Sequence, residues 1–310
     1  MSAGGAEHLL EHGASTAVVT EVGGGLRALE HRGRPLVRAY PRGEVRPRFR
    51  GSLLAPWPNR VGGGRYRFGG REHQLPLTEP ERGNALHGLV CWERFAVRRV
   101  DRATVVARHA LVPRPGYPFR LVVEATYALG EDGLTTTVAA RNDGDDPLPW
   151  GTAGHPYLVA GDGRGPVDGW ELHAPATRVL DVDPDRLLPA DPPGTSPVAG
   201  EDLDFTTARV IGPTPIDHAF TGIVAGADGL ARVRLVDPGS GTGSQITWDP
   251  ASLPWLQLHT ADLPAPEVSR AGLAVEPMTC PPDSFRSGVD LVALGPGEEH
   301  TASWTIGPVG

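Results

Sequence analysis

The chain has 310 residues, and its 37 Asp and Glu outnumber its 29 Lys and Arg, which gives a formal net charge of −8. This excess of negative charge argues against binding to nucleic acid or to an anionic membrane surface. A chain of this length can fill one large β-sandwich or barrel, so we expect a single domain over residues 1–310.

The chain contains two cysteines, Cys91 and Cys280. They lie far apart and outside any C-x-x-C spacing, so neither a disulfide framework nor a thiolate zinc site is indicated. The N-terminal sequence MSAGGAEHLLEHGAS lacks the basic start and apolar run of a signal peptide. No stretch approaches the roughly 18 apolar residues of a membrane span. We therefore expect free, buried thiols in a cytoplasmic protein that makes no membrane contact.

Short apolar runs bounded by Gly and Pro dominate the first half of the chain. Residues 16–22, 94–100 and 104–112 read as strands. The clearest alternation is in residues 119–129, FRLVVEATYAL. The turn GEDG leads from this run into LTTTVAARN, which predicts an antiparallel hairpin.

The second half begins with an irregular segment at residues 183–203, DPDRLLPADPPGTSPVAGEDL. Its five prolines forbid a regular element, and strands of the same composition flank it. We therefore expect a long surface loop inside one domain, not a linker. The strand-like runs that follow are 231–237, 244–248, 254–260, 289–294 and 299–306.

Helical periodicity is missing from this pattern. No run keeps apolar residues at i, i+3, i+4 and i+7 over three helical turns. Many short strands without intervening helices argue against a βαβ architecture. The sequence therefore predicts an all-β fold, either a sandwich or a barrel.

Five polar residues stand out because each lies beside Pro or Gly in an apolar or turn context: Arg60 in PWPNR, His87 in NALHG, His155 in GTAGHPY, Asp217 in PIDHAF and Glu276 in AVEPM. Glu276 is the most unusual, since a carboxylate at the end of an apolar strand is costly to bury without a partner. The others, taken singly, could also brace a loop or cap a turn. A carboxylate and an imidazole together suggest general acid–base chemistry near neutral pH.

Other kinds of site find no support in the motifs. No pair among His87, His109, His155, His218 and His259 has HxH, HxxxH or HExxH spacing, so we expect no metal site. No GxSxG motif indicates a serine nucleophile. The runs VGGG and GDGRG lack the patterns of phosphate-binding loops, and we interpret them as turns.

Six motifs in this order resemble the aldose 1-epimerase, or galactose mutarotase, family: PWPNR, NALHG, HPY, LLPADPPGTSPVAGEDLDF, IDHAF and VEPMTCPPDSF. They extend from about residue 51 to residue 286, and the flanking regions look like the family's outer strands. The ending EPMTCPPDSF is similar to that of bacterial members related to the sulfoquinovose mutarotase branch. The resemblance implies a large antiparallel β-sandwich of the galactose mutarotase type with an open sugar groove. It also implies a small-molecule sugar substrate, no cofactor, and a monomer or homodimer.

The resemblance further implies a role for each motif residue. Glu276 would be the general base for the C1 hydroxyl, His155 the general acid for the ring oxygen, and His87 an assistant near the ring oxygen or a hydroxyl. Sugar hydroxyls would be held by Arg60 and Asp217, with Asn59 and Tyr157 beside them. The stiff PWPNR turn would order the Arg60 guanidinium before it binds.

Two alternatives remain open from the residues alone. A hexose-6-phosphate 1-epimerase would need a cationic clamp, which Arg65, Arg67 and Arg71 could supply, although alternation places Arg65 and Arg67 on a strand face that is commonly solvated. A non-catalytic carbohydrate-binding β-sandwich would need aromatic platforms but no opposed acid and base. The preferred sugar is not encoded in any motif that we recognise.

Overall fold

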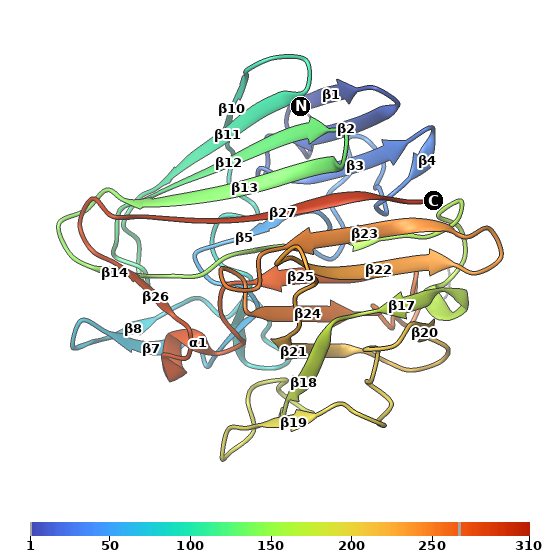
Figure 1. Cartoon of the computed structure of the whole chain (residues 1–310). Helices are drawn as coiled ribbons and strands as arrows, with labels where there is room; N and C mark the ends of the chain where they lie inside the picture. The colour runs from blue at the N-terminus through green and yellow to red at the C-terminus, as the bar shows by residue number, and fades with distance from the viewer. Residues whose placement is uncertain (1, 266–267) are drawn as a thin grey trace.

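The computed structural model describes residues 2–265 and 268–310, and it is built almost entirely of antiparallel strands (Figure 1). Within these two ranges the α-helical structure is limited to α1 (Ser284–Ser287), together with a 3₁₀ turn at Val167–Gly169. No helix in the same ranges is long and apolar enough to cross a membrane. The prediction of a large antiparallel β-sandwich is confirmed.

The largest sheet has nine strands and forms one layer of the sandwich. Its order is β10 (Ala96–Arg99), β11 (Thr104–Leu111), β12 (Leu121–Gly130), β13 (Gly133–Asn142), β27 (Glu299–Val309), β23 (Thr242–Trp248), β22 (Ala231–Asp237), β17 (Glu171–His173) and β20 (Arg209–Val210). The long strand β27 therefore joins the hairpin β12–β13 to the hairpin β22–β23, as Figure 1 shows in the middle of the view.

An eight-stranded sheet forms the second layer. Its order is β19 (Thr195–Pro197), β18 (Ala176–Leu180), β21 (Asp217–Ile223), β24 (Trp255–His259), β25 (Leu273–Met278), β15 (Ala153–Gly154) and β5 (Leu53–Leu54), with β16 (Tyr157–Leu158) also paired to β25. One core cluster holds side chains of both sheets, including Trp304 of β27 and Leu258 of β24. A Cβ added to Gly154 would lie 2.5 Å from the Trp304 ring, so β15 lies directly against β27.

The remaining strands form smaller sheets around these layers. They are β1 (Glu7–His12), β2 (Ser15–Thr20), β3 (Leu26–His31) and β4 (Arg34–Pro35) in one sheet, and the pairs β6 (Arg60–Gly62) with β9 (Asn84–Leu86), β7 (Arg65–Phe68) with β8 (Arg71–Gln74), and β14 (Leu148–Trp150) with β26 (Val292–Leu294). The Tyr127 hydroxyl of β12 donates a hydrogen bond to the Gly24 carbonyl, which ties the N-terminal sheet to the nine-stranded one.

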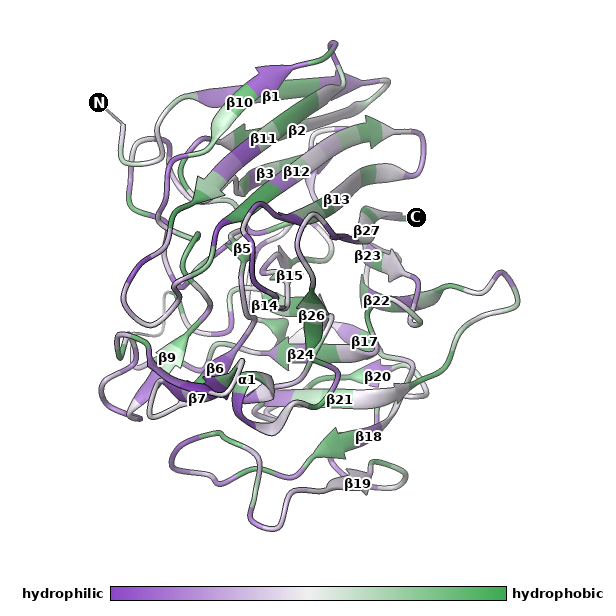
Figure 2. Ribbon diagram, turned by 90° about the vertical axis from the view of Figure 1, so that its left-hand side faces the viewer, coloured by the Kyte–Doolittle hydropathy of each residue, from purple (hydrophilic) through white to green (hydrophobic). Residues whose placement is uncertain are grey.

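The predicted hairpin is confirmed. Leu129 pairs with Leu134, and Gly130 with Gly133, on either side of the tight turn. Buried and partly exposed residues alternate along most of β12. Figure 2 shows bands of different hydropathy along this strand. The run 231–237 coincides with β22, and the other predicted runs differ from the observed strands by a few residues at their ends.

Three details differ from the expectations. The loop 183–203 contains the three-residue strand β19, whose Pro197 is tolerated because β19 is the edge of its sheet. Asp217, expected in a loop, begins β21. Glu276, expected at the end of a strand, is the fourth of the six residues of β25. The two cysteines are free and buried, as predicted.

Candidate active site

A cavity of about 790 Å³ opens on the face of the eight-stranded sheet that points away from the core. All seven residues predicted from the sequence line it: Asn59, Arg60, His87, His155, Tyr157, Asp217 and Glu276. They come from segments up to 217 residues apart in the chain, Asn59 being the first and Glu276 the last. The fold therefore gathers the predicted residues in one place.

Strand register explains why Glu276 points into this cavity. On β25, Val275 belongs to the core cluster, so the alternation of a strand directs Glu276 to the opposite face. On β24, Leu256 and Leu258 belong to the same core, and Gln257 between them is directly opposite Glu276. Two neighbouring strands thus present a carboxyl and an amide side by side.

Glu276 and His155, the predicted base and acid, lie in contact with each other. Glu276 Oε1 lies 3.3 Å from His155 Nε2, and only 1% and 5% of the respective side chains are exposed. Hydrogen bonds on both sides of His155 fix its backbone: its N–H donates to Ser52 O, and Gly51 N–H donates to its carbonyl. Glu276 Oε2 and His155 Nδ1 are buried and have no hydrogen-bond partner among the described residues.

Burial shifts both members of this pair towards their uncharged forms. It raises the pKa of Glu276 well above its usual value, and the nearby Asp217 carboxylate adds to this effect. It lowers the pKa of His155 to about 3, with a further contribution from His259. Near neutral pH the pair therefore holds one proton, and burial favours the arrangement in which both groups are uncharged.

His87 completes an aromatic and imidazole wall next to His155. The two rings meet edge to face with centroids 5.1 Å apart, and the Phe49 ring lies 4.7 Å from His87 on another side. His87 has a φ of 62° and precedes Gly88 with a φ of 76°, so a left-handed turn directs its ring towards the cavity. Burial, followed by the effect of His155, lowers the pKa of His87 well below its usual value. His87 is therefore a neutral imidazole at pH 7.

Arg60 is held more firmly than its turn alone would achieve. Its Nε lies 2.9 Å from Glu79 Oε2, and its Nη2 lies 3.0 Å from Glu79 Oε1, in a two-point contact. The Asn59 Oδ1 accepts a hydrogen bond of 2.9 Å from the Arg60 backbone N–H. Asn59 itself has a φ of 54° within the PWPNR turn. The turn and a buried carboxylate together order the guanidinium.

Asp217 belongs to a chain of polar contacts along the cavity floor. Its Oδ1 accepts a 2.7 Å hydrogen bond from Gln257 Nε2, and Gln257 Oε1 accepts one of 3.2 Å from Asn59 Nδ2. Asp217 Oδ2 also lies 3.7 Å from Arg60 Nη2. About a third of the Asp217 side chain is exposed, which leaves this carboxylate accessible from the cavity.

The sequence interpretation missed Glu79, Gln257 and Phe49. Gln257 carried a usable signal, because a lone amide interrupts the apolar run WLQL just as a carboxylate interrupts LAVEP. Glu79 carried none, since LTEPERGN reads as an ordinary charged turn. The φ of 55° that places Phe49 at the cavity is not visible in the sequence either.

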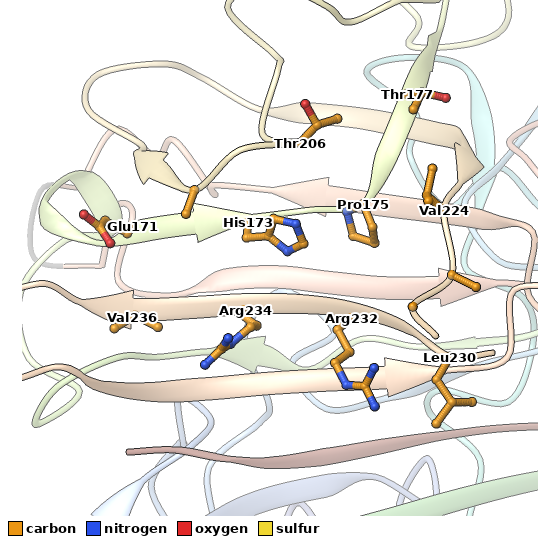
Figure 3. Close-up of a pocket in the computed structure, with 13 residues that line it drawn as sticks. Glu171, His173, Pro175, Thr177, Thr206, Val224, Leu230, Arg232, Arg234 and Val236 are labelled. Carbon is orange, nitrogen blue, oxygen red and sulfur yellow. The ribbon is translucent and has the colours of Figure 1, made fainter. Parts of the chain in front are cut away.

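A second cavity, of about 700 Å³, lies on the outer face of β17 and β22 (Figure 3). His173, Arg232 and Arg234 line it, and Arg232 is paired with Asp228. Among the described residues no hydrogen bond or ion pair joins a carboxylate to His173, so this cavity lacks an acid–base pair. Residues 2–265 and 268–310, which the structure describes, contain no group of three His, Cys, Asp or Glu placed to hold a metal ion.

Comparison with known proteins gives a consistent result. The family described as aldose 1-epimerase matches residues 7–307. The uncharacterized protein YihR of Escherichia coli is 34% identical over 291 residues, which cover 94% of this chain and 89% of that protein. The galactose mutarotase of Mus musculus is 28% identical over 180 residues, 56% of this chain and 49% of that protein. The solved GalM/aldose epimerase homologue from C. elegans shares the fold, with a TM-score of 0.83, 18% identity and coverage of 98% and 100%.

Proposed function

Because the chain belongs to the aldose 1-epimerase family of isomerases, we propose that it interconverts the α and β anomers of a hexose by opening and closing the sugar ring. The observation that carries this proposal is the contact of 3.3 Å between a buried carboxyl and a buried imidazole in a cavity lined with hydroxyl-binding groups. The name of the mouse relative supports an unmodified hexose as the first substrate to test.

Opening a cyclic hemiacetal requires two proton transfers, one at each of the two oxygens bonded to C1. A proton leaves the hydroxyl oxygen on C1 while another arrives at the ring oxygen, so an acid and a base have to flank that carbon. We assign Glu276 as the base and His155 as the acid. After rotation about the C1–C2 bond, closure on the other face reverses their roles. The reaction transfers no electron and no group, so it requires no cofactor.

The number of protons held by Glu276 and His155 together fits this cycle. Ring opening uses the carboxylate of Glu276 and the imidazolium of His155, and it leaves the pair uncharged. Ring closure starts from that uncharged pair and restores the charged one. Both forms hold a single proton, and burial favours the uncharged form. The positive charge of Arg60 acts against burial, because it lowers the pKa of Glu276. Arg60 therefore favours the carboxylate form that ring opening requires.

The groups around the pair orient the sugar. Arg60 donates and Asp217 accepts, so together they suit a sugar hydroxyl, which does both. Gln257 and Asn59 hold Asp217 and the Arg60 turn in place through the hydrogen bonds described above. Ordering these groups before binding reduces the cost of association, and correct placement of C1 contributes to the rate.

The two alternative functions receive less support from the structure. Arg65, Arg67 and Arg71 are exposed on β7 and β8 and do not line the cavity, so the phosphate clamp of a hexose-6-phosphate epimerase is not formed by them. A purely binding module gains nothing from a buried carboxyl and imidazole that face each other, because burial of ionisable groups costs stability.

The free thiols support a reducing compartment and hence the predicted cytoplasmic location.

Polarimetry or NMR exchange on freshly dissolved α-glucose and α-galactose tests the proposal. The parent protein is expected to speed the approach to anomeric equilibrium. Glu276→Gln and His155→Asn are each expected to lower that rate on the order of 10² to 10⁴-fold while the fold is retained. Glu72→Gln, which removes an exposed pair with Arg67, is the matched control. Unchanged rates in both site variants would exclude the assigned mechanism.

The same assay identifies the preferred sugar. A panel of glucose, galactose and sulfoquinovose, each measured at several concentrations, ranks the substrates by kcat/KM. The motifs do not decide whether the preferred sugar is an unmodified or a sulfonated hexose. The ranking by kcat/KM answers this question.

A further inference from the structure

Glu79 is the most thoroughly bound carboxylate near the cavity, and the mechanism above does not use it. Besides its two-point contact with Arg60, its Oε2 accepts a 2.9 Å hydrogen bond from Asn84 Nδ2. Only 7% of its side chain is exposed, although it lines the cavity. The backbone of Glu79 and Asn84 closes the turn between them with hydrogen bonds in both directions. Glu79 is therefore fixed in one orientation.

This carboxylate changes the charge that a substrate meets at Arg60. One guanidinium faces two carboxylates, Glu79 at 2.9 Å and Asp217 at 3.7 Å. Arg82 also approaches Glu79, at 3.7 Å, but a third of its side chain is in solvent, where a charge is screened more strongly. At these closest contacts two carboxylates face the single positive charge of Arg60, so that charge is offset before any ligand binds.

The guanidinium nevertheless keeps donors for a ligand. Its Nε and Nη2 point to Glu79, whereas Nη1 makes one long contact, of 3.5 Å, with Asn59 Oδ1. An arginine has five N–H groups, so Nη1 can still donate to an oxygen in the cavity. An uncharged hydroxyl gains this hydrogen bond. An anionic group would gain it too, but it would also meet the two carboxylates that flank Arg60.

We propose that Glu79 sets the substrate class of this site by cancelling the charge of Arg60, so that this end of the cavity accepts an uncharged hydroxyl and rejects a phosphate or other anionic substituent. The inference rests on the proposed function, in which Arg60 binds the sugar. It assigns Glu79 a role in specificity without any contact with the reacting atoms.

Inorganic phosphate is the probe, and calorimetric titration measures its binding without any need for activity. Glu79→Gln keeps the size of the side chain and removes its charge. We expect this variant to bind phosphate about tenfold more tightly than the parent does, and phosphate to become a competitive inhibitor of anomer exchange. The KM for a neutral hexose is expected to rise in the same variant, because Arg60 is less well ordered.

Glu79→Asp separates charge from shape. It keeps the negative charge but is too short to reach both guanidinium nitrogens, so it is expected to lower kcat/KM while leaving phosphate binding as weak as in the parent. Glu72→Gln, which breaks an exposed pair with Arg67, is the control for loss of a Glu–Arg pair elsewhere. If Glu79→Gln folds poorly, the inference predicts that phosphate raises its melting temperature and not that of the parent.

Two results would overturn the inference. One is phosphate binding in Glu79→Gln no tighter than in the parent, and the other is a gain of phosphate binding in Glu79→Asp. If the parent fails to speed anomer exchange, the proposed function fails, but the titrations still decide whether Glu79 controls the charge at Arg60.

Discussion

Glu276, the proposed general base, is buried at a cost to the stability of the fold. Its side chain is 1% exposed, and burial raises its pKa well above the usual value. In the unfolded chain the same carboxyl ionises at its ordinary pKa, in water. The folded state therefore holds a proton at neutral pH that the unfolded state has released, and this difference opposes folding.

Glu276→Gln is expected to raise the melting temperature at pH 7, by on the order of 2 °C, while abolishing most of the activity. A group whose folded pKa is raised contributes its stability below the unfolded pKa and loses it as pH rises through the folded pKa. The gain from Gln, which does not ionise, should therefore be small near pH 4 and larger at pH 7. Thermal melts of both proteins across this range check the sign, and a gain that shrinks as pH rises would contradict it.

At the scale of elements, one strand and one turn decide the geometry of the site. The register of β24 against β25 places Gln257 opposite Glu276, and the turn before Gly88 directs His87 towards them. Gly88 has a φ of 76°, and a Cβ there would overlap the carbonyl of Ala55. Only glycine satisfies both requirements at this position.

Gly88→Ala is expected to destabilise the protein by about 1–3 kcal/mol more than a control that shares the same φ. Gly70 is that control, because its φ is also 76° but nothing lies within 4 Å of an added Cβ. Urea unfolding of Gly88→Ala and Gly70→Ala separates the cost of the clash from the cost of the backbone angle. Equal losses in the two variants would mean that the clash with Ala55 is relieved without cost.

The elements also show where sequence reasoning succeeds and where it stops. Alternation located the hairpin β12–β13 because each of its strands has ten residues, which is long enough to display the period. It missed two- and three-residue strands such as β15 and β9, which have too few residues for a period. The motif residues were found because Pro and Gly mark their turns, whereas Glu79 meets Arg60 through a pairing of β6 with β9 that no local pattern specifies.

At the scale of the whole molecule, one continuous core joins all the large sheets. Leu10 of β1, Val123 of β12, Trp304 of β27 and Leu258 of β24 belong to the same buried cluster. The cavity rests on the outer face of the sheet that this core supports, so the site depends on packing some distance below it. On the basis of this continuity we propose that the chain forms a single domain.

Calorimetry is expected to show a single cooperative unfolding transition, because no part of this core can separate without exposing the rest. Trp304→Ala, which empties the contact between β27 and β15, is expected to lower the stability of the whole transition by about 3–5 kcal/mol. Two resolved transitions, only one of them shifted by the substitution, would show instead that the layers unfold independently.

A crystal structure of Glu276→Gln with a bound hexose tests the central claim most directly. The account predicts that the C1 hydroxyl lies within about 2.6–3.2 Å of residue 276 and that the ring oxygen lies at a similar distance from His155. A hexose bound with C1 directed away from both side chains, or bound only in the second cavity beside His173, would contradict it.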